Sequence, residues 1–170
     1  MTSQNPATPA TFPARRLLLL AAVAGGVGLV LAVASTFAHA PDWGLLARQP
    51  WVIQVHIAAA VAALLLGTVQ LVGIKGTRIH RLIGWSWVVA MFTVAVSSFF
   101  IRQINPGAFS WIHLLSGWTL IALPMALFAI RRGRVVSHAS GMTWTFIGGL
   151  IVAGAFTFLP GRLMWEVFFG

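Results

Sequence analysis

Residues 51–74 read WVIQVHIAAAVAALLLGTVQLVGI, a run of 24 residues without Asp, Glu, Lys or Arg. The only strongly polar side chains in this run belong to Gln54, His56, Thr68 and Gln70. An α-helix rises about 1.5 Å per residue, so about 20 mostly apolar residues cross the hydrocarbon core of a bilayer. This stretch therefore predicts a transmembrane helix.

Four further stretches have the same character, and none of the five contains Asp, Glu or Lys. The predicted spans are 17–38, 52–74, 82–101, 111–130 and 142–159. Pro, Gly and Asn clusters separate them, and these residues favour turns. Because short loops make consecutive helices run antiparallel, we expect an all-α integral membrane protein with an up-and-down bundle. We expect residues 1–16 to form a disordered cytoplasmic tail, 51–159 the core helices, and 160–170 a short outer tail.

The composition excludes a soluble protein. Hydrophobic residues make up 59% of the chain, charged residues only 8%, and the mean hydropathy is +0.91. A soluble domain carries roughly 25% charged residues. The net charge of +9 comes from short basic clusters between the apolar stretches, a distribution typical of membrane topology and not of nucleic-acid binding. With no cysteine, disulfides, thiolate metal sites, iron–sulfur clusters and covalent c-type haem are excluded.

The basic residues predict the orientation, because Lys and Arg gather in the cytoplasmic flanks of membrane spans. An N-terminus on the inside gives the inner side eight basic residues and the outer side three. The inner set is Arg15, Arg16, Lys75, Arg78, Arg81, Arg131, Arg132 and Arg134; the outer set is Arg48, Arg102 and Arg162. We therefore expect the N-terminus inside, the C-terminus outside, and a place in the inner (plasma) membrane of a bacterium.

Histidines are the ionisable groups most able to do chemistry at membrane depth here, because the predicted spans contain no carboxylate. His56 and His113 lie near the outer ends of the second and fourth spans. His80 and His138 precede the third and fifth spans on the inner side, and His39 stands apart at the outer end of the first. Because we expect His56 and His113 at one depth in the membrane and His80 and His138 at another, His56 can face His113 and His80 can face His138. Two imidazoles facing inward from a helix bundle can serve as the two axial ligands of a haem iron.

Two glycines place the inner histidines inside helices. Gly76 and Gly133 are expected to break the chain, and helices that begin just after them would include His80 and His138 in their first turns.

A short internal repeat accompanies the histidines. Residues 79–85, IHRLIGW, match 112–118, IHLLSGW, at five of seven positions and an offset of 33. In each copy a glycine, Gly84 or Gly117, follows the histidine by four residues and so shares its helix face. Such a glycine leaves clearance for a planar macrocycle, and Gly67 continues a small-residue face below the histidine of the second span. Close helix–helix packing uses the same small residues, so both interpretations stay open.

These motifs resemble two known groups of membrane proteins. The His-x-x-x-Gly patterns and the four histidines on consecutive helices resemble the cytochrome b561-type di-haem proteins. The wider pattern resembles a family of bacterial predicted membrane proteins of unknown function. Its features are His56 with Gly67 and Gln70, His80-Arg81 with Gly84, His113, and Arg132-Gly133 before His138. Where that family usually shows Trp-Met after its last histidine, this chain has Gly141-Met142.

The favoured function is transfer of electrons across the bilayer by one or two b haems, which His56, His113, His80 and His138 would ligate. Gly67, Gly84 and Gly117 would line the haems. Arg78 and Arg81 would pair with haem propionates or with an anionic donor such as ascorbate, although basic clusters also serve topology and lipid contact. A quinone is a further expected donor, membrane lipid an expected partner, and a homodimer or a larger complex an expected assembly.

Two alternatives belong to other functional classes. In the first, the protein is free of haem and binds copper or zinc through the outer histidines His39, His56 and His113. In the second, it is a small transporter or an accessory subunit in which the histidines only bridge helices. The colour of the purified protein separates the haem hypothesis from both.

Overall fold

A computed structural model of the chain describes residues 40–101 and 111–170. The first predicted span, His39 and Arg102 lie outside the described residues. Residues 42–168 make up one structural unit, and the elements below belong to it. Its regular structure is helical throughout the described ranges, as the sequence predicted.

Four helical segments are long and apolar enough to cross a membrane. They are α3 (Trp51–Val72), α4 (Arg78–Ser98), α5 (Trp111–Arg131), and α6 (Val135–Phe146) continued by η1 (Ile147–Val152) and α7 (Ala153–Phe156). Four of the predicted spans are thus confirmed as helices of sufficient length. Two short helices at one end of the unit were not predicted: α2 (Trp43–Ala47) and α8 (Leu163–Phe169).

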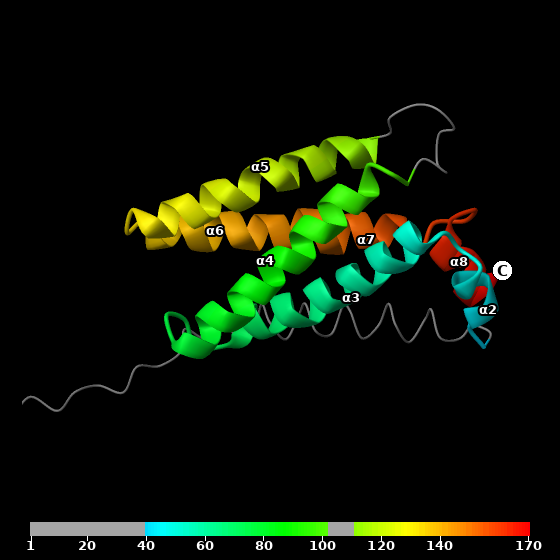
Figure 1. Ribbon diagram of the computed structural model, residues 1–170, viewed down its shortest axis with the longest axis horizontal. Helices are drawn as coiled ribbons and strands as arrows, with labels where there is room; N and C mark the ends of the chain where they lie inside the picture. The colour runs from blue at the N-terminus through cyan, green and yellow to red at the C-terminus, as the bar shows by residue number, and fades with distance from the viewer. Residues whose placement is uncertain (1–39, 102–110) are drawn as a thin grey trace, which may run out of the picture. The chain divides into compact units, whose positions relative to one another are not determined.

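Consecutive helices pack side by side: α3 on α4, α4 on α5, and α5 on α6 (Figure 1). The turns before α4 and α6 contain Gly76 and Gly133 with φ of 80° and 72°, a left-handed conformation that glycine adopts at little cost. Because α4 begins at Arg78 and α6 at Val135, both inner histidines lie in the first turns of helices, as predicted.

The core of the unit is small and joins all four long segments. It contains Ala63 of α3, Trp87 and Met91 of α4, Leu123 of α5, Phe146 of α6 and Leu150 of η1. Most other large apolar side chains on these helices face outward. An exterior of this kind is stable in lipid and would aggregate in water.

The last long segment contains a π-helical turn, η1, that was not predicted. A methyl group on Gly149 would lie 3.0 Å from Met91 Cε and 3.3 Å from Thr119 Oγ1. The glycine therefore lets η1 lie close against α4 and α5. π-helical turns inside α-helices are often found at functional sites.

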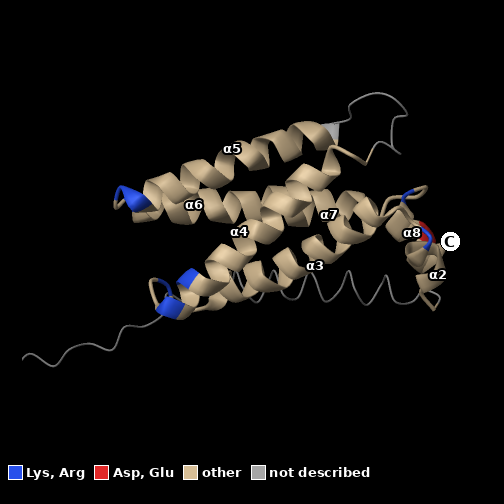
Figure 2. Cartoon of the chain, in the orientation of Figure 1, with Lys and Arg blue, Asp and Glu red and all other residues tan. Residues whose placement is uncertain are grey.

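Charged residues gather at the two ends of the unit (Figure 2). The α3–α4 turn and the start of α4 carry Lys75, Arg78 and Arg81, while the α5–α6 turn carries three arginines. The chain's two carboxylates, Asp42 and Glu166, belong to the opposite end, beside α2 and α8.

Candidate functional site

His138 is held by a hydrogen bond to the neighbouring helix. Its Nδ1 lies 2.9 Å from the backbone oxygen of Ala126 on α5. A carbonyl oxygen can only accept, so Nδ1 carries the proton and donates it. In a neutral imidazole the lone pair then belongs to Nε2. Histidines that ligate metals are typically oriented by this kind of bond from the other ring nitrogen.

His80 is anchored through its backbone at the start of α4. Its N–H donates to Oγ1 of Thr77, the N-cap residue, at 3.0 Å, and its carbonyl accepts from Nε2 of Gln70 at 2.8 Å. Its side-chain Nδ1 is buried and, within the described part of the chain, has no hydrogen-bond partner. His80 and His138 lie in the first turns of α4 and α6, directly after the two turns that carry the basic clusters. Their pairing about one iron stays a prediction.

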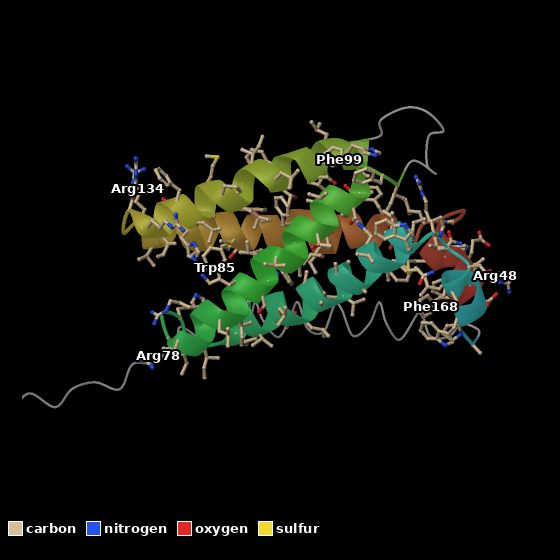
Figure 3. The ribbon with its side chains drawn as sticks, in the orientation of Figure 1. Arg48, Arg78, Trp85, Phe99, Arg134 and Phe168 are labelled. Atoms are coloured by element: carbon tan, nitrogen blue, oxygen red, sulfur yellow. The ribbon has the colours of Figure 1, made fainter. Side chains whose placement is uncertain are left out.

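Basic side chains surround this end of the bundle. Figure 3 shows Arg78 at the start of α4 and Arg134 at the turn before α6. Arg81 donates from Nη1 to the carbonyl of Gly76 at 3.1 Å, and the guanidinium of Arg132 lies 4.2 Å from the ring centre of Phe128. Arg78 and Arg81, the two predicted propionate partners, are both exposed.

The side chain of Lys75 caps the C-terminus of α3. Its Nζ donates to the carbonyls of Leu71 and Gly73 at 2.8 and 2.9 Å, and also to that of Gln70. Burial lowers the pKa of this ammonium from its ordinary value. A cation at a helix C-terminus stabilises the unpaired carbonyls there, so Lys75 has a structural role.

His56 on α3 contacts α4 at the other end of the bundle. Its Nδ1 lies 2.9 Å from Oγ of Ser97. Oγ of Ser97 lies 2.5 Å from the backbone oxygen of Thr93 and 3.1 Å from that of Val94. Its one hydroxyl proton is therefore donated within its own helix. Ser97 therefore accepts from His56, and Nε2 again carries the lone pair.

His113 on α5 is buried, with 5% of its surface exposed. Its ring centre lies 5.9 Å from that of Phe99 at the end of α4, and Figure 3 shows Phe99 beside the start of α5. Next to it, Oγ of Ser98 donates to Oγ of Ser116 at 2.6 Å. His56 and His113 thus both contact the last turn of α4, from opposite neighbours. Their pairing about one iron stays a prediction.

The three glycines proposed to line a haem have different surroundings. A methyl group on Gly67 would lie 2.5 Å from ring carbons of Phe146 and 2.6 Å from Nε1 of Trp87. At Gly84 it would lie 2.6 Å from Nε2 of Gln70. The space over these two glycines is therefore occupied by protein. At Gly117 a methyl group would meet nothing within 4 Å, so open space remains there.

Among the described residues no group of three or more His, Asp or Glu side chains is placed to hold a metal ion. His39, one of the three residues of the copper or zinc alternative, lies outside the described ranges. A haem iron needs only two protein ligands, so this finding does not bear on bis-histidine ligation. The side chain of Gln54 donates to the backbone oxygens of Ala47 and Gln49.

Sequence reasoning missed the groups that hold the histidines. Ser97 and the carbonyl of Ala126 are the hydrogen-bond acceptors, and Gly141 allows the second of these contacts. A backbone carbonyl leaves no mark on a sequence pattern. A serine in an apolar helix is a weak signal, because Ser and Thr usually bond to their own helix in lipid.

Residues 53–169 match a family described as "Predicted membrane protein (DUF2306)". The match covers α3 from Ile53 onward, the other three long segments, and the four histidines of the described residues. The comparisons with curated proteins and with solved structures found no match.

Proposed function

The chain belongs to the DUF2306 family of predicted membrane proteins, and we propose that it is a b-type cytochrome that carries electrons across a bilayer. It would bind haem between His80 and His138 near one surface and between His56 and His113 near the other. One observation carries the proposal: Nδ1 of His138 donates to the carbonyl of Ala126, which leaves the lone pair on Nε2 for a metal ion.

The inner histidines fit the requirements of an axial pair. They come from two different helices, α4 and α6, and each lies within a first helical turn. Nδ1 of His80 is buried and has no bond partner among the described residues, and a buried polar atom of this kind is costly unless something binds it. The nearby arginines suit the anionic propionates of haem b.

The outer histidines fit less completely. His56 is held in the Nδ1–H form by Ser97, and His113 is buried near Phe99. The open space at Gly117, one turn from His113 on α5, offers clearance for a flat ring. The sites of Gly67 and Gly84 offer none, so the outer haem would rest on α5 and not on the α3 face.

The chain's own residues would hold and insulate the cofactor. Bound haem supplies a metal centre that accepts and releases one electron. Ser97 and Ala126 fix the tautomers of two ligands, and the core of Trp87, Met91, Leu123 and Phe146 excludes water between the two ends. Exposed Arg78 and its basic neighbours would attract an anionic donor such as ascorbate or support a quinol at the inner surface.

The same proposal includes a topology. The Lys75–Arg81 and Arg131–Arg134 clusters would face the cytoplasm, with the end that carries α2 and α8 outside and a fifth span, 17–38, before the described residues. The proposal includes a place in the inner membrane of a bacterium. Reporter fusions at Gly107 and Gly133 would give opposite sides of the membrane, and the same side for both would contradict it.

Absorbance of the purified full-length protein tests the function. We expect a Soret band that shifts on reduction with dithionite, and pyridine haemochrome analysis that gives two haems per chain. His80→Ala and His138→Ala should each halve the haem content, and His56→Ala and His113→Ala should each remove the other half. His39→Ala is the matched control and should change neither value.

Colourless protein from haem-replete cells would overturn the proposal. Metal analysis would then separate a copper or zinc protein from a transporter or accessory subunit. Haem that survives all four histidine substitutions would also overturn it, because the ligands would have to lie elsewhere.

A further inference from the structure

Helices α5 and α6 approach each other closely near His138. A methyl group on Gly141 would lie 2.9 Å from Cβ of Ala126 and 3.7 Å from its Cα. Carbon atoms in contact prefer about 3.5–4.0 Å, so a side chain at residue 141 would force the helices apart. The same Ala126 provides the carbonyl that accepts from His138, three residues before Gly141.

The two contacts share one face of α6. Residues three apart in an α-helix are neighbours on its surface, so His138 and Gly141 meet α5 together. A hydrogen bond at 2.9 Å is close to the optimal length and weakens steeply when its partners separate. The hydrogen bond of His138 therefore depends on residue 141 being a glycine, which has no side chain.

We propose that Gly141 is a positioning residue for His138. By admitting α5 to close contact, it lets Nδ1 donate to Ala126 and so makes Nε2 the lone-pair nitrogen. This tautomer assignment stands on geometry alone; its use in haem ligation rests on the function proposed above. A residue in the second turn of α6 thereby helps to decide which ring nitrogen of His138 can bind a ligand.

Nitrogen NMR of the haem-free, full-length protein in lipid nanodiscs tests the assignment. With ¹⁵N-labelled histidine, the two ring nitrogens of a neutral imidazole give distinct shifts according to which is protonated. The signals of His138 are identified by their loss in His138→Gln. We expect the Nδ1–H form in the wild type, and a population at least about twofold lower in Gly141→Ala, because the lengthened bond no longer favours it.

Two variants make the result specific. Gly154→Ala is the matched control, since a methyl group there meets nothing within 4 Å and the residue follows on the same helical segment. It should leave the tautomer of His138 unchanged. The double variant Ala126→Gly with Gly141→Ala moves the methyl group from α5 to α6, and should restore the Nδ1–H form. If Gly141→Ala does not fold, the double variant alone decides.

Each outcome bears on the proposal. An Nε2–H form in the wild type, an unchanged tautomer in Gly141→Ala, or no Nδ1–H form in the double variant would overturn it. In protein that contains haem, Gly141→Ala should also lower the inner haem content while Gly154→Ala does not. A wild-type protein without haem would overturn the proposed function. The role of Gly141 in positioning His138 would then still be tested by the NMR measurement.

Discussion

The side chain of Gln70 ties the end of α3 to the start of α4 by donating from Nε2 to the carbonyl of His80 at 2.8 Å. It passes over Gly84, where a methyl group would lie 2.6 Å from the same nitrogen. The His-x-x-x-Gly pattern therefore has a function in the protein alone: glycine admits the amide that fixes the backbone of His80. Clearance for a cofactor is not needed to explain Gly84.

Gly84→Ala should displace this amide. The loss of the hydrogen bond should lower the free energy of unfolding by about 1–2 kcal/mol, because the carbonyl of His80 loses a partner. Thermal unfolding of the protein in detergent measures the effect. Gln70→Ala should cost a similar amount, and the double variant little more than either, since both remove one interaction. Additive losses would show that Gly84 and Gln70 act separately.

Gly67→Ala should be among the more damaging glycine substitutions. Its methyl group would lie 2.5 Å from ring carbons of Phe146 and 2.6 Å from Nε1 of Trp87, and both rings are buried in the core. Overpacking of this kind typically costs 1–3 kcal/mol. We expect a lower midpoint of thermal unfolding, with Gly154→Ala as a control close to the wild type. An unchanged midpoint would mean that the core has room to rearrange.

Ser97 and Ser98 allow a matched comparison at the outer histidines. Both are buried, and each makes one bond to a neighbouring helix: Ser97 to His56, Ser98 to Ser116. Their alanine variants should lose similar stability, about 1 kcal/mol each. Only Ser97→Ala should raise the reduction potential of the outer haem, because a weaker bond from Nδ1–H makes His56 a less basic ligand and the ferric state less stable. Redox titration measures it, and equal shifts in both variants would contradict the role of Ser97.

Sequence reasoning predicted the four spans within the described residues well, because the requirements of a bilayer are strict. About 20 apolar residues with breakers between them leave few alternatives to a helix. The starts of α4 and α6 also followed, since Gly76 and Gly133 adopt positive φ and Thr77 caps the helix after the first of them. Helices α2 and α8 escaped prediction because five to seven residues carry too weak a periodicity.

The surroundings of the histidines were harder to predict. The sequence pattern predicted that all four histidines lie on helices at two depths, but it could not predict which side chains contact them. Gly67 and Gly84 shared the face expected for a cofactor, and the space over them is filled by Phe146, Trp87 and Gln70. A small residue shows that something approaches closely, whether protein or cofactor, and tertiary packing alone decides between the two.

Gly117 is therefore the glycine that tests the cofactor most directly. A methyl group there meets nothing within 4 Å, so Gly117→Ala should leave the haem-free fold intact and stabilise α5 slightly, by about 0.5–1 kcal/mol of helix propensity. If a haem ring rests on this face beside His113, the same methyl group would meet the ring. We expect the variant to lose most of the outer haem and keep the inner one, measured by pyridine haemochrome analysis and by redox titration. Gly154→Ala, equally open in its surroundings, should keep both haems. Full haem content in Gly117→Ala would show that the ring lies elsewhere, because a methyl group cannot share the space of a macrocycle in contact with the helix.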